Sequence, residues 1–190
     1  MPASKIMLIR HAERPSDDGK VRGVTAAGDQ DSEELVVRGW QRSGALVRLF
    51  APRNGVFADP RLAEPKTIFA SPFVKHGGSL RPKHTVLPLA EALGFPLDLR
   101  FPKGKEPDLA EAAVKAEGPV LIAWQHEAIP DIVNTIVDNK TTCPQKWHGS
   151  RYDLVWVLDR RTSGPGWDFA QVPQMLLAGD SETKIAFSSE

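Results

Sequence analysis

The chain has 190 residues, 41% of them hydrophobic and 25% charged, which is the composition of one ordinary globular domain. Basic and acidic residues both number 24, so the net charge is zero, and we expect no nucleic-acid partner and no anionic membrane surface. One cysteine, Cys143, excludes an internal disulfide, and no apolar run is long enough to cross a membrane. We expect a single domain over residues 1–190, located in the cytoplasm.

The first element is a short apolar run, residues 6–9, followed by Arg10-His11-Ala12-Glu13 and a polar loop. A brief run of branched apolar residues with a turn signal after it predicts a buried strand. The charged residues therefore fall at the carboxyl end of a strand, where ligands bind in an open α/β sheet. An arginine and an imidazole at that edge can hold and attack an anionic group.

Helices and strands then alternate along the chain. The spacing of apolar residues predicts four helices, over residues 40–50, 82–93, 109–116 and 132–137. Short apolar or alternating runs predict strands at 67–70, 97–101 and 120–124. The second helix ends at Gly94 and contains Pro88, which we expect to kink or split it. The strand at 120–124 is the most apolar run, so we expect it to be central in the sheet.

The last third of the chain changes character. Residues 153–159 and 167–172 are strand-like runs, and the link between them contains Gly-Pro-Gly, which favours a hairpin. Strands that alternate with helices predict a mostly parallel sheet with helices on both faces. The expected fold class is therefore α/β, with a late antiparallel hairpin.

Three positions fall on the carboxyl edge of this predicted sheet. His11 ends the first strand, Arg81 follows the second, and His126 ends the strand at 120–124. Arg10 and Arg81 can hold an oxyanion with planar, bidentate forks, and the helices that begin near Arg81 and Pro130 add backbone N–H groups. Two imidazoles and two guanidinium groups around one point would repel one another without an anion, so the sequence predicts an anion site.

Other motifs do not fit. His126-Glu127 begins like the zinc-protease pattern His-Glu-x-x-His, but Pro130 stands where the second histidine is required. Cys143 and His148 have no second pair that would complete a metal site. Neither a Gly-x-Gly-x-x-Gly motif after a strand nor a Walker phosphate loop is present.

Four segments together resemble the histidine phosphatase superfamily, also called the phosphoglycerate mutase-like family. Residues 6–13, Ile-Met-Leu-Ile-Arg-His-Ala-Glu, resemble its Arg-His-Gly signature. The likeness continues through 38–42, through 79–85, which looks like the second-arginine segment, and through 122–126, which resembles the second-histidine strand. The resemblance implies a phosphoglycerate mutase-like fold and covers most of the chain before the hairpin.

The resemblance also implies a mechanism. His11 would be the nucleophile that attacks phosphorus and forms a phosphohistidine, while Arg10, Arg81 and His126 would hold the phosphoryl oxygens and neutralise charge. Because these cationic side chains supply the charge, the resemblance implies neither a metal nor an organic cofactor.

The proton donor is where the chain departs most from this family. Glu127 follows the second histidine, where the mutase-like branch usually has glycine and the acid-phosphatase and phytase branch usually has aspartate. By position, Glu127 is the first candidate for the acid that protonates the leaving group, and Glu106, just before the third predicted helix, is the alternative. Glu13 is expected to be a structural partner of the loop.

The function implied is hydrolysis of a phosphomonoester, either a phosphorylated small molecule or a phosphoprotein. The alternatives are a phosphomutase of the same superfamily and a catalytically weak phosphate-binding or interaction protein. A mutase needs a lid that excludes water, for which the short chain offers little material. Selectivity would come from the loops at 14–31, 51–66, 71–80 and 102–107. The sequence leaves the substrate and the oligomeric state open.

Overall fold

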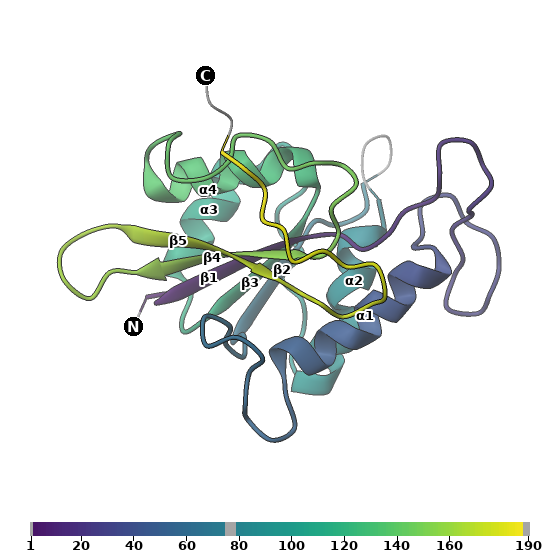
Figure 1. Cartoon of the computed structure of the whole chain (residues 1–190), viewed down its shortest axis with the longest axis horizontal. Helices are drawn as coiled ribbons and strands as arrows, with labels where there is room; N and C mark the ends of the chain where they lie inside the picture. Colours follow the sequence, from purple (N-terminus) through teal and green to yellow (C-terminus); the bar gives the residue numbers. More distant parts are fainter. Residues whose placement is uncertain (1, 75–78, 188–190) are drawn as a thin grey trace.

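A computed structural model describes residues 2–74 and 79–187, and its centre is one five-stranded sheet in the order β2-β3-β1-β4-β5 (Figure 1). The strands are β1 (Lys5–Arg10), β2 (Thr67–Ala70), β3 (Val120–Trp124), β4 (Leu154–Arg160) and β5 (Trp167–Pro173). β1, β2 and β3 run parallel, whereas β4 is antiparallel to β1 and β5 is antiparallel to β4. The predicted fold class, a mostly parallel sheet with a late hairpin, is confirmed. The middle place belongs to β1, with β3 buried beside it.

Helices cover both faces of the sheet (Figure 1). On one face lie α1 (Val37–Phe50) and α2 (Arg81–Leu93), and on the other lie α3 (Glu106–Lys115) and α4 (Ile129–Val137). A single 3-10 turn, His126–Ala128, leads from β3 into α4. The chain therefore crosses from strand to helix at the carboxyl edge of the sheet, which is where the predicted site residues fall.

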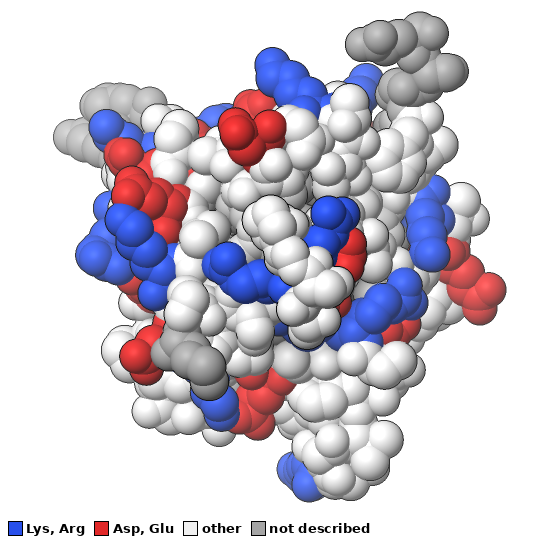
Figure 2. All heavy atoms as spheres, turned by 90° about the vertical axis from the view of Figure 1, so that its left-hand side faces the viewer, with Lys and Arg blue, Asp and Glu red and all other residues white. Residues whose placement is uncertain are grey.

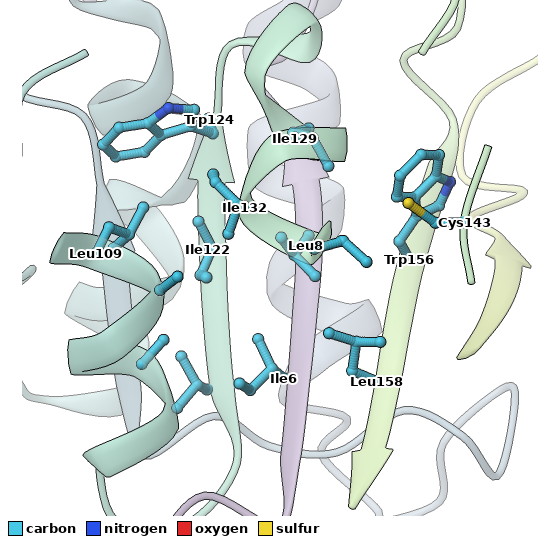
Figure 3. Close-up of a cluster of buried hydrophobic side chains, with 14 of the residues drawn as sticks. Ile6, Leu8, Leu109, Ile122, Trp124, Ile129, Ile132, Cys143, Trp156 and Leu158 are labelled. Carbon is cyan, nitrogen blue, oxygen red and sulfur yellow. The ribbon is translucent and has the colours of Figure 1, made fainter. Parts of the chain in front are cut away.

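Two buried cores hold these layers together. The pleat of β1 sends Met7 and Ile9 into the core beneath α1 and α2, and sends Ile6 and Leu8 into the core beneath α3 and α4. Figure 3 shows the second of these cores, where Ile6 and Leu8 lie among apolar side chains of β3, β4, α3 and α4. Because both faces of β1 are buried, the strand is a fixed base for the residues that follow it.

The helix that contains Pro88 is not split, contrary to one of the two outcomes expected. α2 runs without interruption through this residue. A proline cannot donate to the carbonyl group four residues earlier, which here belongs to His84. The buried Ser43 hydroxyl of α1 donates to that oxygen at 2.7 Å and to the Thr85 oxygen at 3.0 Å. A neighbouring helix thus satisfies the acceptor that proline leaves free.

The strand predicted at 97–101 is wrong. Only one bridge forms, with Asp98 beside Phe69, through hydrogen bonds from Asp98 N to Ile68 O (2.9 Å) and from Ala70 N to Asp98 O (3.1 Å). The Asp98 carboxylate turns back to the Arg100 backbone and side chain, so local bonds end the pairing. The segment covers the edge of β2 without extending the sheet.

The amino edge of the parallel strands lies opposite the predicted site. Figure 2 faces this side of the molecule, and basic and acidic side chains are interspersed over it. Within the described residues, no helix is long and apolar enough to cross a membrane.

Candidate active site

The carboxyl ends of β1 and β3 and the start of α2 surround one pocket of about 360 Å³. The residues singled out in the sequence that line it are Arg10, His11, Arg81, His126 and Glu127. Four further residues complete the lining, namely Arg14, Ser79, Lys103 and Gln125. The parallel register explains this meeting, because Arg10 of β1 pairs directly with Trp124 of β3. Residues 75–78 of the predicted selectivity loop 71–80 lie outside the described part of the chain.

His11 is held as a neutral imidazole with one free nitrogen. Its backbone N–H donates to the Trp124 carbonyl oxygen at 2.9 Å, which continues the β1–β3 pairing by one residue. Its Nδ1 lies 2.8 Å from the Ala12 carbonyl oxygen, which can only accept, so Nδ1 carries the proton. Burial, and then the nearby Arg10 charge, lower the pKa of His11 to about 3. Nε2 therefore keeps its lone pair at neutral pH, as a nucleophile requires.

Arg10 is buried beside the His11 imidazole and keeps its charge. Its Nη1 donates to the Gly149 carbonyl oxygen at 2.5 Å, and its guanidinium carbon lies 3.8 Å from the centre of the Tyr152 ring. Burial is the main cause that lowers the pKa of Arg10 to about 10, so the side chain stays protonated at neutral pH. The segment that carries Gly149 and Tyr152 thus fixes the position of this guanidinium.

Arg81 begins α2 and faces Arg10 across the pocket lining. Its backbone N–H donates to Ser79 Oγ at 3.1 Å, and its Nη1 donates to the Ser32 carbonyl oxygen at 3.0 Å. Burial lowers the pKa of this guanidinium as well. Thr85, one turn further along α2, accepts from the Ala12 backbone N–H at 2.8 Å. The same helix therefore places Arg81 and fixes the loop of the nucleophile.

The pocket has buried hydrogen-bonding atoms that no other described residue satisfies. Seven such side-chain atoms without a hydrogen bond occur in the described residues, and five of them belong to residues lining this pocket. One of the five, His126 Nδ1, lies 3.1 Å from a Glu127 carboxylate oxygen without forming a hydrogen bond. Three of the five are guanidinium nitrogens, Nε and Nη2 of Arg10 and Nε of Arg81. Buried polar groups are nearly always paired in proteins, so an unpaired set indicates a missing partner. Charged donors of this kind are matched by an anion with several oxygens.

Glu127 is ionised and lies between the Lys103 ammonium group and the His126 imidazole. One carboxylate oxygen accepts from Lys103 Nζ at 2.6 Å, and the other lies 3.1 Å from His126 Nδ1. The contact with His126, and then that with Lys103, lower the pKa of the Glu127 carboxyl well below its ordinary value, although partial burial opposes the shift. Without a ligand, this carboxyl is therefore a base.

Glu106, the alternative acid, is not among the residues that line the pocket. Its Oε1 accepts from the Trp124 indole N–H at 3.0 Å and from the Gly104 backbone N–H at 3.1 Å. The carboxylate thus joins the loop before α3 to the end of β3. In this arrangement it supports the pocket wall.

Glu13 points away from the pocket into a buried ion network. Its carboxylate accepts from Arg42 Nη2 at 2.8 Å and from Arg38 Nε at 3.2 Å, both on α1. Arg42 Nη2 also donates to Asp180 at 2.7 Å. The network links the loop after β1 to α1 and to the C-terminal segment. Gly39 lies between the two arginines, and a Cβ there would stand 2.7 Å from the Glu13 carbonyl oxygen, so only glycine allows this approach.

Residues at or beside the pocket that sequence reasoning missed include Lys103 and Gln125 of its lining and Tyr152, which lies against Arg10. Lys103 lies in a loop, where charge alone carries no signal. Tyr152 is the single tyrosine of the chain, and it lies in the unassigned stretch before the hairpin. Gln125, beside His126, donates from Nε2 to Ser71 Oγ at 3.0 Å, while its Oε1 is buried without a partner. Only Gln125 had a usable signal, since it is a polar residue at the end of a buried strand.

A metal-binding cluster is not found in the described residues, where no group of three or more His, Cys, Asp or Glu side chains could hold an ion. Cys143 is buried and contacts Asn134, and burial raises the pKa of its thiol to about 12. This cysteine therefore lacks the thiolate character of a nucleophile or a metal ligand.

Comparison with solved structures finds phosphatases of the same fold. Mycobacterial glucosyl-3-phosphoglycerate phosphatase matches with a TM-score of 0.52 at 13% identity, over 90% of this chain and 97% of that chain. A histidine-to-alanine mutant of phosphoserine phosphatase from Entamoeba histolytica, in complex with phosphoserine, matches with a TM-score of 0.51 at 13% identity, over 87% and 95%. A protein proposed to be an α-ribazole-5′-phosphate phosphatase of Escherichia coli matches with a TM-score of 0.51 at 10% identity, over 97% and 99%.

Neither a model of a known protein family nor a curated protein matches the sequence. The likeness therefore rests on three-dimensional structure. This chain has the phosphoglycerate mutase-like fold that these phosphatases share, as the sequence resemblance implied.

Proposed function

We propose that residues 1–190 form one catalytic domain of the histidine phosphatase superfamily, which hydrolyses a phosphomonoester through a phosphohistidine on His11. The observation that carries the proposal is the set of unpaired guanidinium donors around a neutral imidazole. A phosphoryl dianion supplies the oxygens that these donors lack, with its phosphorus in front of the free His11 nitrogen. The shared fold with solved phosphatases supports the same conclusion.

The first step is attack by His11 Nε2 on phosphorus, as the bond from phosphorus to the ester oxygen breaks. Arg10, Arg81 and His126 hold the phosphoryl oxygens and stabilise the transition state by position and charge. Nδ1 keeps its proton and donates a hydrogen bond to the Ala12 carbonyl oxygen (2.8 Å), so the ring that accepts the phosphoryl group is correctly oriented and is stabilised as it becomes cationic.

The leaving alkoxide requires a proton, which we assign to Glu127. Because this carboxyl is ionised without ligand, it has to take up a proton from solvent before it can act as an acid. The negative charge of a phosphoryl dianion bound nearby favours that uptake. After the leaving group departs, the same carboxylate can accept a proton from the water that attacks the phosphohistidine. That step releases inorganic phosphate and restores neutral His11. The ionised carboxylate of Glu127 thus suits hydrolysis of the phosphohistidine, where it acts as a base. Substrate binding favours the protonated carboxyl that the first step needs as an acid.

Hydrolysis fits the pocket better than transfer within a bound substrate. The side chains of Lys103 and Glu127 are 43% and 49% exposed, so water reaches the position where the leaving group would be. A mutase has to exclude that water. The substrate is a phosphorylated small molecule or a phosphoprotein with an accessible phosphoryl group.

The test is turnover and trapping. Wild-type protein is expected to hydrolyse at least one member of a panel of phosphorylated metabolites, phosphopeptides and an aryl phosphate, and to retain an acid-labile label from a ³²P-labelled ester. His11→Ala should lose both activity and label while its circular dichroism spectrum is unchanged. His148→Ala, which alters an exposed histidine, is the matched control. Turnover by folded His11→Ala would overturn the mechanism.

A further inference from the structure

The residue that leads beyond the proposed function is Lys103, because a built turn presents it to the pocket. The Lys105 backbone N–H donates to the Pro102 carbonyl oxygen at 3.0 Å, which closes a four-residue turn. Gly104 has a φ of 93°, a conformation that favours glycine at the third position of a type II turn. Lys103 occupies the second position, with its side chain among the pocket residues.

This turn is fastened to the active-site strand. The Glu106 carboxylate accepts from the Gly104 N–H at 3.1 Å and from the Trp124 indole at 3.0 Å. Trp124 is fully buried and is the last residue of β3, two residues before His126. The position of Lys103 is therefore tied to that of the phosphate-binding histidine.

In the protein without ligand, Lys103 pairs with Glu127, the carboxyl that the proposed reaction uses as its acid and base. Lys103 Nζ contacts Glu127 at 2.6 Å, and both side chains are close to half exposed. Exposed ion pairs of this kind contribute little to stability, so another anion can replace Glu127 at small cost. As long as the pair persists, the lysine opposes protonation of the carboxyl.

The phosphoryl group does not require this cation. Arg10 and Arg81 together match the two negative charges of a phosphoryl dianion, and both have donors that are unpaired among residues 2–74 and 79–187. Arg14, also in the pocket lining, donates two hydrogen bonds to the Asp17 carboxylate, of 2.6 and 3.0 Å, whereas Lys103 donates one to Glu127. Lys103 is thus the cation that a different group of the substrate can use.

We propose that Lys103 is a subsite for a second anionic group, a carboxylate or a further phosphate, carried by the leaving-group part of the substrate. This inference rests on the proposed phosphatase function and names its preferred substrate class. As the second anion draws Lys103 away, Glu127 loses one of the two contacts that keep it ionised. The substrate itself then favours the protonated acid that the departing oxygen needs.

The test uses two esters that differ in this one group. Glycerol 3-phosphate and 3-phosphoglycerate have the same phosphoryl ester, and the second carries a carboxylate where the first has a hydroxymethyl group. Wild-type protein is expected to show a kcat/KM about five- to tenfold higher for 3-phosphoglycerate, the size of one charge-assisted contact in a partly exposed pocket.

Lys103→Gln should bring the ratio of the two kcat/KM values close to one. Lys105→Gln, which removes the same charge from the neighbouring exposed position outside the pocket lining, should leave the wild-type ratio unchanged. A wild-type ratio near one, or a ratio that Lys103→Gln does not alter, would overturn the subsite. Equal loss of preference in both variants would also overturn it, because that result indicates general electrostatic attraction.

Binding separates this inference from the proposed function. Calorimetry with non-hydrolysing His11→Ala protein should give tighter binding of 3-phosphoglycerate than of glycerol 3-phosphate, by a similar factor that disappears when Lys103→Gln is added. If wild-type protein hydrolyses no ester at all, the proposed function fails, and these binding ratios still decide whether the subsite exists. Equal affinities for the two esters would reject it.

Discussion

Two clusters of arginine and acidic side chains lie on either side of the loop that follows β1, and they are built in opposite ways. In the network of Glu13, Arg38, Arg42 and Asp180, every charged group meets a partner of opposite sign. In the pocket, Arg10 and Arg81 retain buried nitrogens that have no partner in the described part of the chain. Residue type does not distinguish the clusters, but hydrogen-bond satisfaction does.

The difference shows what each cluster contributes. A satisfied buried network has no capacity left for a ligand, so it fixes the loop between β1 and α1 against the C-terminal segment. A buried cluster with unpaired donors lowers the stability of the folded state, and a bound anion can offset that loss by accepting from them. Residues 10–13 thus divide into two roles within four positions: Arg10 and His11 face the pocket, and Glu13 faces the network. Variants that affect one cluster and not the other test this division.

The largest effect on stability is expected from Arg42→Met. The Arg42 side chain is 3% exposed and is shared by Glu13 and Asp180. Its removal leaves two buried carboxylates without their main cation, which costs about 3–5 kcal/mol of unfolding free energy. Urea denaturation measures the loss.

Arg38→Met is the matched control for this prediction. Arg38 contacts the same two acids, but its side chain is 43% exposed, so its removal should cost about 1 kcal/mol or less. Equal losses for the two variants would show that burial does not decide the strength of the network.

Arg81→Met, in contrast to Arg42→Met, should lower activity strongly and change stability little. Among the described residues, the side chain makes one hydrogen bond, from Nη1 to the Ser32 carbonyl oxygen, and its buried Nε has no partner there. Loss of a donor to the transition state lowers kcat on the order of 10²–10³-fold. The unfolding free energy should change by about 1 kcal/mol or less, because this side chain forms few hydrogen bonds with the protein when no ligand is bound. A stability loss as large as that of Arg42→Met would contradict the division of roles.

The sequence predicts the framework of the pocket cluster for a simple reason. Parallel strands with buried faces must end on one edge, so apolar runs followed by Arg10-His11 and by His126 already indicate that these residues lie close together. The backbone chemistry of Pro88 alone predicts either a kink in α2 or a split. The split does not occur, and the Ser43 hydroxyl, from another helix, donates to the carbonyl group that Pro88 leaves free.

What the sequence does not predict depends on contacts between distant segments. Tyr152 lies against Arg10 although 142 positions separate them along the chain, and no periodicity marks such a pair. Glu106 has the type and place of an acid, but its hydrogen bonds to Trp124 and Gly104 give it a supporting position. Whether a carboxylate faces a pocket or a backbone N–H is decided by packing.

The pH dependence of stability should show the effect of the unsatisfied cluster. The unfolded chain protonates His11 below its ordinary pKa of 6.5, whereas in the folded protein burial lowers that pKa to about 3. Since the unfolded state binds the proton first, stability is lost as the pH falls through 6.5. Between about pH 7.5 and 4.5 this loss amounts to roughly 2–3 kcal/mol.

Urea denaturation across this range measures the loss as a slope. His11→Gln should flatten the slope by that amount, and His148→Gln, at an exposed position, should keep the wild-type slope. The satisfied cluster acts at lower pH. Burial raises the pKa of Asp180, but Arg42 and the backbone N–H groups of Leu176 and Leu177 together outweigh it and lower that pKa to about 2. An unchanged slope in His11→Gln would show that this imidazole is not held neutral.

The smallest effect is expected at Tyr152, and it tests how the pocket arginine is positioned. The Arg10 guanidinium carbon lies 3.8 Å from the centre of this ring, close enough for a cation–π contact of about 1 kcal/mol. Tyr152→Phe keeps the ring and should leave KM nearly unchanged, whereas Tyr152→Leu should raise KM about fivefold with a smaller change in kcat. Trp167, stacked on Arg160 at 4.4 Å at the far end of the hairpin, is the control. Trp167→Leu should lower the unfolding free energy without raising KM. If Phe and Leu at position 152 raise KM equally, the hydroxyl rather than the ring face positions Arg10.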